Sequence, residues 1–272
     1  MLKKRWFKVI LTLFTVYVLY LGALYSMQRG MVFPGQVRKA RVTTETVLAT
    51  GGQVVALPMG GEAWWYSRDN RHPVVLVFHG NGELIEDWMS QAMAWRDDGL
   101  QVMLVEYPGY GRAQGSPSYE SILNAAQEAV KEARKRVLAS VPFFAFGTSL
   151  GTGVASELGA MGMVDAVILV APYTSLQAMA RRRLAPGFLV RDRFDNKSAL
   201  QKFTGRRLII HGKNDFQIPW RMGKNLADIA PERTQFHAVP DRGHTSVLDR
   251  HCFDLVRRWI QNEVLRHENR GG

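Results

Sequence analysis

The fold of this chain is decided by the stretch Val141-Pro142-Phe143-Phe144-Ala145-Phe146-Gly147-Thr148-Ser149-Leu150-Gly151-Thr152-Gly153-Val154-Ala155. Its first six residues are apolar and aromatic, which is typical of a strand buried on both faces of a sheet. The residues after Gly151 continue as a helix. Between strand and helix lies a G-x-S-x-G pattern, which predicts a nucleophile elbow, a tight turn that lifts the Ser149 hydroxyl above the sheet edge.

Two glycines flank the serine in this pattern. Side chains at Gly147 and Gly151 would clash with neighbouring backbone in so sharp a turn. The pentapeptide alone is only moderately specific, and an ordinary loop is the competing interpretation. The strand before it and the helix after it favour the elbow.

Strand and helix patterns alternate on both sides of the elbow. Further strands are predicted at 63–66, 74–78, 102–107, 166–170, 207–210 and 234–239, with helices at 83–95 and 119–137. The segment Thr43–Met59 alternates apolar and polar residues around Gly51-Gly52, which predicts a hairpin. We therefore expect an α/β domain with a mostly parallel central sheet, helices on both faces and the hairpin at one edge.

The N-terminus carries an apolar run that begins after Lys8 and meets no charge until Arg29. A helix of this length, at about 1.5 Å per residue, just crosses a hydrocarbon core of about 30 Å. A cleaved signal peptide is the alternative, but such peptides end in small residues, which Leu24-Tyr25-Ser26-Met27 does not supply. We expect residues 1–30 to be an uncleaved membrane anchor and residues 31–272 to be the catalytic domain.

Basic residues outnumber acidic ones, with 35 Lys and Arg against 24 Asp and Glu and a formal net charge of +11. No nucleic-acid-binding motif accompanies this charge, so nucleic acid is not an expected partner. Anionic lipid headgroups fit a basic anchored protein better, and a merely solvated surface is the alternative. The basic cluster before the span favours an extracytoplasmic domain, on the periplasmic or luminal side, although Arg29, Arg38 and Lys39 weaken that inference.

A serine nucleophile needs a base to remove its proton and an acid to orient the base. Asp215 and His244 each follow a predicted strand downstream of Ser149, and we expect them to be that acid and base. Asp241 is the alternative acid. His211, which ends the strand before Asp215, is interpreted as structural.

An oxyanion intermediate needs two backbone N–H donors. Leu150 is expected to supply one, as the residue after the nucleophile, and the loop His79-Gly80-Asn81-Gly82 the other. The N–H of Asn81 is the expected second donor. His79 is expected to brace this loop through a side-chain hydrogen bond.

Six separate motifs together resemble the α/β-hydrolase superfamily. They are His79-Gly80-Asn81-Gly82, Tyr107-Pro108-Gly109-Tyr110-Gly111, Gly147-Thr148-Ser149-Leu150-Gly151, Ala171-Pro172-Tyr173-Thr174-Ser175-Leu176, His211-Gly212-Lys213-Asn214-Asp215 and Gly243-His244. Within that superfamily the chain is similar to the Bem46 and ABHD13/ABHD17-like group of serine hydrolases, often described as S33-type peptidase-like domains. The resemblance implies an α/β-hydrolase fold with Ser149 as nucleophile, Asp215 as acid and His244 as base.

Residues 171–203 should form a short cap over the site. This segment contains Arg181-Arg182-Arg183 and then an apolar stretch at 184–190. S33 aminopeptidases need acidic groups to hold a free amine, so this basic cap disfavours peptidase activity. A small-molecule or lipid-like acyl ester is the expected substrate.

These features predict a membrane-anchored serine hydrolase that cleaves carboxylic esters or thioesters through an acyl-enzyme. An acyltransferase using the same triad and a non-catalytic binding protein on a hydrolase scaffold are the alternatives. No metal or cofactor is expected, because the sequence has no metal-ligand spacing and no Rossmann or P-loop glycine pattern. The single cysteine, Cys252, excludes an intrachain disulfide and is expected to be a buried hydrophobe. The oligomeric state is not predicted.

Overall fold

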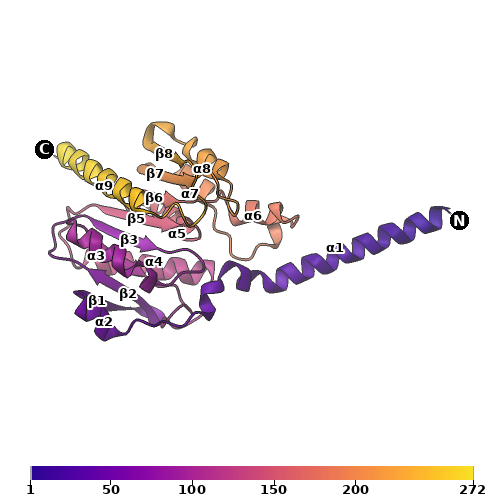
Figure 1. Cartoon of the computed structure of the whole chain (residues 1–272), viewed down its shortest axis with the longest axis horizontal. Coiled ribbons are helices and arrows are strands. Elements are labelled where there is room, and N and C mark those ends of the chain that lie inside the picture. Colours follow the sequence, from indigo (N-terminus) through magenta and orange to yellow (C-terminus); the bar gives the residue numbers. More distant parts are fainter. Residues whose placement is uncertain (1, 272) are drawn as a thin grey trace.

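Eight strands form one sheet in the computed structural model, which describes residues 2–271 (Figure 1). Their order across the sheet is β1-β2-β4-β3-β5-β6-β7-β8. Strands β3 to β8 are parallel to one another, and β1 and β2 form an antiparallel edge. The strands are β1 Gly52–Leu57, β2 Gly61–Tyr66, β3 Val74–Phe78, β4 Gln101–Val105, β5 Phe143–Thr148, β6 Ala166–Val170, β7 Arg206–Gly212 and β8 Thr234–Val239. The predicted mostly parallel sheet is confirmed.

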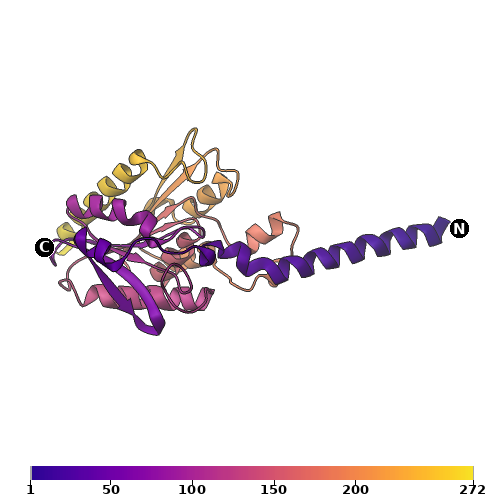
Figure 2. The same ribbon diagram turned by 60° about the horizontal axis from the view of Figure 1, so that its bottom comes forward.

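Helices cover both faces of this sheet (Figures 1 and 2). Helices α4, α5, α7 and α8 bury side chains against one face, and α2, α3 and α9 against the other. The helices are α1 Leu2–Val32, α2 Thr44–Ala49, α3 Met89–Asp97, α4 Tyr119–Arg134, α5 Gly151–Ala160, α6 Leu176–Arg182, α7 Asn196–Lys202, α8 Trp220–Ala227 and α9 Arg250–Gly271.

The central strands are apolar on both sides because both sides are covered. In β3, Val74, Leu76 and Phe78 pack into one hydrophobic cluster, while Val75 and Val77 pack into the other. Successive side chains of a strand point to opposite faces, so a strand between two helix layers becomes a continuous apolar run. This arrangement explains why the parallel strands were recognisable in the sequence. Cys252 is buried in the second cluster, as expected.

The hairpin predicted at Thr43–Met59 is wrong in its position. Its first part is helix α2, which begins after Thr43, whose hydroxyl accepts a hydrogen bond from the Thr46 N–H. The hairpin of the structure instead joins β1 to β2 through a turn at Pro58–Gly60. Because α2 is six residues long and buries only Val47, no helical period could show in the sequence.

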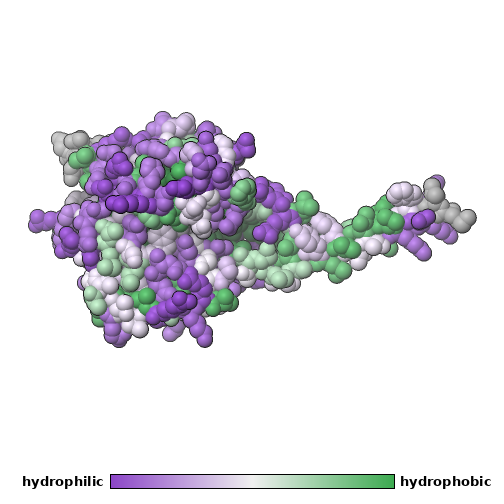
Figure 3. All heavy atoms as spheres, in the orientation of Figure 1, coloured by the Kyte–Doolittle hydropathy of each residue, from purple (hydrophilic) through white to green (hydrophobic). Residues whose placement is uncertain are grey.

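Helix α1 projects from the domain at the carboxyl edge of the sheet, beside α6 (Figures 1 and 2). Its Lys3–Val32 part is long and apolar enough to cross a membrane, and its surface is mostly hydrophobic beyond the hydrophilic N-terminal end (Figure 3). The chain after it packs on the domain, where Phe33 and Gly35 are buried. That short segment is therefore part of the fold.

Candidate active site

The turn between β5 and α5 presents Ser149 in a left-handed conformation, with φ of 49°. Its N–H donates to the Val170 carbonyl at 2.9 Å, which fixes the turn to the neighbouring strand. A Cβ added at Gly147 would lie 2.7 Å from the Thr152 nitrogen, and one at Gly151 would lie 2.9 Å from the His79 carbonyl oxygen. Backbone therefore occupies the space that side chains would need, and this turn has the form of the predicted elbow.

Three strand ends bring the predicted triad residues together. Ser149 follows β5, Asp215 follows β7, and His244 follows β8. The Ser149 Oγ lies 3.0 Å from His244 Nε2, and His244 Nδ1 lies 2.7 Å from Asp215 Oδ2. Asp241, the alternative acid, is exposed, and the imidazole faces Asp215 instead.

The Asp215 carboxylate is held by donors on both oxygens. Its Oδ1 accepts the N–H groups of Gln217 and Ile218 at 2.9 and 2.8 Å. Burial opposes ionisation, but hydrogen bonds from His211, His244 and the Ile218 N–H outweigh it and hold the pKa of Asp215 well below its usual range. The carboxylate therefore stays ionised and holds the Nδ1 proton of His244 in place.

His211 supports this carboxylate from the buried side. Its Nε2 lies 3.2 Å from Asp215 Oδ2 and 2.9 Å from the Ile218 carbonyl oxygen, and the ring is fully buried. The structural interpretation of His211 thus becomes specific, because the ring positions Asp215. The sequence analysis missed this contact. Its signal was the spacing of four residues between His211, at the end of a strand, and Asp215 in the turn that follows.

The residues predicted to supply the oxyanion donors both lie at the cavity over Ser149. Asn81 and Leu150 line the same cavity as Ser149 and His244. Within residues 2–271, neither the Asn81 N–H nor the Leu150 N–H has a protein acceptor. Donors of this kind are what an oxyanion intermediate requires, so their role as oxyanion donors stays a prediction.

The cavity over Ser149 has a volume of about 570 Å³, which is typical of small-molecule sites. Its walls come from α1, from the cap segment and from the loop after β7. Apolar side chains dominate, and the charged side chains among the described lining residues are Arg182 and Arg183, apart from the titratable His244. The described lining includes no carboxylate that could hold a substrate amine.

Comparisons with known proteins show what the chain is similar to. A family model described as serine aminopeptidase, S33, matches residues 69–194. The uncharacterised protein Rv2307c of Mycobacterium tuberculosis is 29% identical over 254 residues, which cover 87% of this chain and 88% of that protein. Lysophosphatidylserine lipase ABHD12 of Danio rerio is 30% identical over 196 residues, or 63% of this chain and 51% of that protein.

A solved structure shares the fold. Est1E from Butyrivibrio proteoclasticus superposes with a TM-score of 0.64 at 16% sequence identity, covering 80% of this chain and 99% of that one. The chain has the α/β-hydrolase fold. Its sequence is similar to the S33 family model and to a lysophosphatidylserine lipase.

Hydrogen bonds among buried side chains hold the loop after β3 in place. His79 places Nδ1 2.8 Å from the Gly80 carbonyl oxygen and Nε2 2.8 Å from the Glu106 carboxylate. The Tyr107 hydroxyl donates to the His79 carbonyl at 2.7 Å. Burial alone would lower the pKa of His79, but the hydrogen bond and charge of Glu106, with the hydrogen bond to Gly80, together outweigh it and raise that pKa. The predicted bracing role of His79 is confirmed, whereas Glu106 was missed, since 27 residues separate it from His79.

The segment after the N-terminal helix also holds this loop. The Gly35 N–H donates to the Asn81 carbonyl at 3.0 Å, and the Tyr110 hydroxyl donates to the same oxygen at 2.9 Å. A Cβ at Gly35 would overlap the Tyr110 ring and lie 2.9 Å from that oxygen. The position of the Asn81 peptide therefore depends on a glycine just outside α1.

Replacing Gly35 by alanine should lower kcat/KM for p-nitrophenyl acetate about tenfold. The displaced Asn81 N–H would stabilise an oxyanion less well, though removing a donor outright typically costs about 10²- to 10³-fold. The matched control is Gly30→Ala, because a Cβ at Gly30 meets nothing within 4 Å. Equal rates for Gly35→Ala and Gly30→Ala would contradict the coupling between this segment and the oxyanion loop.

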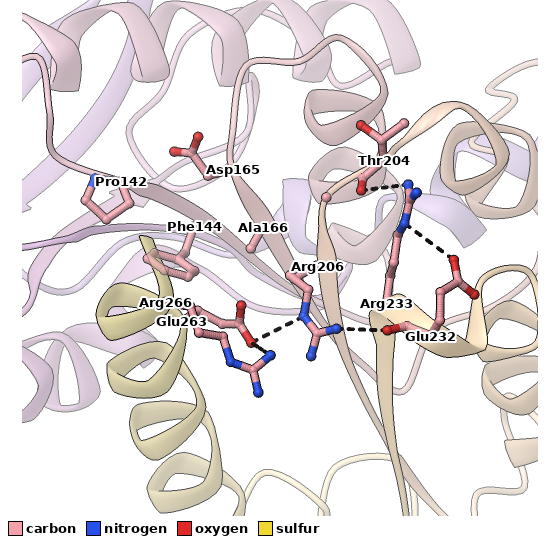
Figure 4. A pocket seen from close by; sticks show the side chains of 11 residues that line it. Pro142, Phe144, Asp165, Ala166, Thr204, Arg206, Glu232, Arg233, Glu263 and Arg266 are labelled. Atoms are coloured by element: carbon pink, nitrogen blue, oxygen red, sulfur yellow. Dashed lines mark hydrogen bonds and ion pairs between the residues drawn. The ribbon is translucent and has the colours of Figure 1, made fainter. Parts of the chain in front are cut away.

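A second cavity lies at the opposite end of the sheet (Figure 4). It has a volume of about 460 Å³ and is lined by residues at the amino ends of β5, β6 and β7. Its charges are satisfied locally: Arg206 pairs with Glu263 at 3.3 Å, and Arg233 donates to the Thr204 carbonyl at 2.9 Å. Ligands of parallel α/β sheets bind at the carboxyl ends, so this cavity is not the candidate site.

Proposed function

We propose that this protein is a membrane-anchored serine esterase that cleaves carboxylic ester or thioester bonds through an acyl-enzyme. The observation that carries the proposal is the 3.0 Å contact between Ser149 Oγ and His244 Nε2, with Asp215 2.7 Å from the other ring nitrogen. A hydroxyl, an imidazole and a carboxylate in this order form an activated nucleophile.

In the proposed reaction, His244 Nε2 takes the hydroxyl proton as Ser149 Oγ attacks the carbonyl carbon. The N–H groups of Asn81 and Leu150 stabilise the oxyanion, and Asp215 stabilises the imidazolium. Collapse of the tetrahedral intermediate expels the alcohol or thiol, which receives the proton from His244. A water molecule then attacks the acyl-enzyme with His244 as its base, which releases the acid and restores Ser149.

We divide the chain into an anchor, a catalytic domain and a cap, mainly because α1 is apolar and exposed. We assign residues 1–30 as a single-pass anchor, residues 31–272 as the catalytic domain and residues 171–203 as its short cap. Helix α1 supports this assignment with a mean hydropathy of 2.0 over 18 residues, none of which is buried. The basic residues before the span favour an extracytoplasmic domain.

A lipid-like acyl ester fits the cavity better than a peptide amine. The family model carries an aminopeptidase description, but Arg182 and Arg183 would repel a protonated amine, and no described lining residue is acidic. A lysophosphatidylserine lipase among the relatives supports a lipid ester as the substrate class.

The exposed run Arg181–Arg183 should promote turnover at anionic membranes. Replacing all three arginines by glutamine should lower turnover of an ester embedded in anionic vesicles several-fold more than turnover of a soluble ester, since each basic residue near such a surface gains about 1 kcal/mol. The control makes the same charge change on α9, at the exposed residues Arg250, Arg258 and Arg266. Equal losses on both substrates would contradict a membrane role for the cap arginines.

The test of the proposed function is a product analysis with purified full-length protein. Wild type should convert p-nitrophenyl esters to p-nitrophenol and free carboxylic acid. If an added alcohol acceptor captured nearly all acyl groups, the protein would be an acyltransferase with the same triad. Absence of turnover across acetyl to dodecanoyl esters would contradict the proposal and favour a non-catalytic binding protein.

A further inference from the structure

Helix α1 changes character along its length. From Lys3 to Tyr20 its described side chains are all exposed. Beyond that point, half-buried side chains recur every three or four residues, at Leu21, Leu24, Gln28 and Val32, with Arg29 beside Gln28. This spacing places them on one face of the helix, because an α-helix has 3.6 residues per turn. The last third of α1 therefore has a buried face, whereas the rest does not.

The cap segment contacts α1 on this side. Five polar contacts join them. The hydroxyls of Tyr17 and Tyr20 donate to the Leu184 and Arg183 carbonyls at 2.8 and 2.5 Å. Gln28 donates to the Leu189 carbonyl at 3.2 Å and accepts from the Arg191 N–H at 2.8 Å, and Arg29 pairs with Asp192 at 3.3 Å. Helix α6 accordingly lies beside the domain end of α1 in both ribbon views (Figures 1 and 2). The helix is docked on the cap.

The cavity over Ser149 lies between these two elements. On one side it is lined by Leu21, Leu24 and Val32 of α1, and on the other by Leu176, Met179 and Leu189 of the cap. Ser149 and His244 line the cavity with polar groups, and the helix and cap walls are mostly apolar besides Gln28, Arg182 and Arg183. Such a division suits an ester group with an attached hydrocarbon chain.

The same part of α1 must also lie in the membrane. A hydrocarbon core of about 30 Å needs about 20 residues of helix. The uncharged run Val9–Gln28 is only just that long, so the span has to include Leu21 and Leu24. These residues therefore lie at membrane depth and line the cavity at once.

The tip of the cap has the composition of a membrane-contacting surface. Leu184 and Phe188 are 76% and 74% exposed, and Arg181–Arg183 adjoin them. Apolar side chains beside arginines suit the boundary between acyl chains and headgroups, where the cations meet anionic lipid. The hydroxyls of Tyr17 and Tyr20 donate to carbonyls of this tip, which joins it to α1.

We infer that the last third of the anchor helix and the cap together form an acyl-chain subsite that opens into the bilayer, so that a membrane-borne acyl ester reaches Ser149 without leaving the membrane. This inference rests on the proposed function and adds to it a substrate class and a route of entry. Leu24 and Met179, from opposite walls, determine how long a chain the subsite accepts.

The test compares chain-length selectivity in the full-length protein in detergent micelles. Leu24→Trp fills the cavity from α1 and should lower the ratio of kcat/KM for p-nitrophenyl dodecanoate to that for p-nitrophenyl acetate at least tenfold. Met179→Trp fills it from the cap, leaves α1 unchanged and should shift the ratio in the same direction. The matched control is Leu19→Trp, on the exposed opposite side of α1 at 67% exposure, which should leave the ratio within twofold of wild type.

The outcomes separate the inference from the proposed function. An unchanged ratio in both Leu24→Trp and Met179→Trp, with wild type active on both esters, would overturn the subsite alone. A ratio lowered equally by Leu19→Trp would also overturn the subsite, because a tryptophan anywhere in α1 would then lower the ratio. Wild type that hydrolyses neither ester would overturn the proposed function, and the inference with it.

Discussion

Replacing Ser149 by alanine is expected to lower kcat for ester hydrolysis on the order of 10⁵-fold or more, which is the scale on which a serine nucleophile contributes. Alanine keeps the Cβ that Ser149 already places in the left-handed turn, so the elbow carries no new strain. The variant should therefore unfold at nearly the wild-type temperature. The measurement is kcat for p-nitrophenyl acetate together with a thermal unfolding curve.

The control for this prediction is Ser140→Ala, at an exposed serine just before β5. It should hydrolyse the ester at the wild-type rate. Residual activity of Ser149→Ala above about one per cent, in a folded protein, would mean that another group is the nucleophile.

Replacing Asp215 by asparagine should lower kcat about 10⁴-fold, the size of effect seen when a triad carboxylate becomes an amide. An amide N–H would donate to His244 Nδ1, so the ring would carry its proton on Nε2 and could not accept the Ser149 proton. The pKa of Asp215 lies well below its usual range, so the carboxylate is ionised wherever the enzyme works. The wild-type pH–rate profile should therefore show no inflection from Asp215, and measuring kcat of both proteins across that profile checks the prediction.

The control for Asp215→Asn is Asp241→Asn, at the exposed aspartate three residues before His244. Asparagine tolerates the positive φ of 54° at this position, so the fold should not change. Activity within twofold of wild type is expected. A larger loss in Asp241→Asn than in Asp215→Asn would transfer the acid role to Asp241.

The lowered pKa of Asp215 also has a consequence for stability. An unfolded aspartate takes up a proton near pH 3.9, whereas the folded carboxylate stays ionised below that pH. Its contribution to the free energy of unfolding is therefore present above about pH 3.9 and is lost as the pH falls further. Asp215→Asn should accordingly destabilise the fold more at pH 7 than at acid pH.

The parallel core and the elbow could be predicted because local sequence determines them. Strands such as β3 and β6 are short apolar runs between turns, and Gly147 and Gly151 mark the turn that needs them. The positions of Asp215 and His244 at strand ends were also predictable, since parallel strands bring their carboxyl ends to one edge. Their roles in catalysis stay predictions.

Other features depend on contacts between distant residues. Nothing local to His79 indicates Glu106 as its partner, and nothing local to Gly35 indicates a hydrogen bond to Asn81. The apolar run of α1 predicted a membrane span. Nothing in that run indicates that its residues also line the cavity over Ser149. Helix α2 was mistaken for a strand because six residues are too few to show a helical period.

The most direct test of the account is labelling of the membrane fraction with a fluorophosphonate probe, which reacts only with an activated serine. Wild type should label, with the adduct on Ser149, and both Ser149→Ala and His244→Ala should lose the label while remaining folded. Labelling that persists in Ser149→Ala, or a folded wild type that does not label at all, would contradict the claim that His244 activates Ser149.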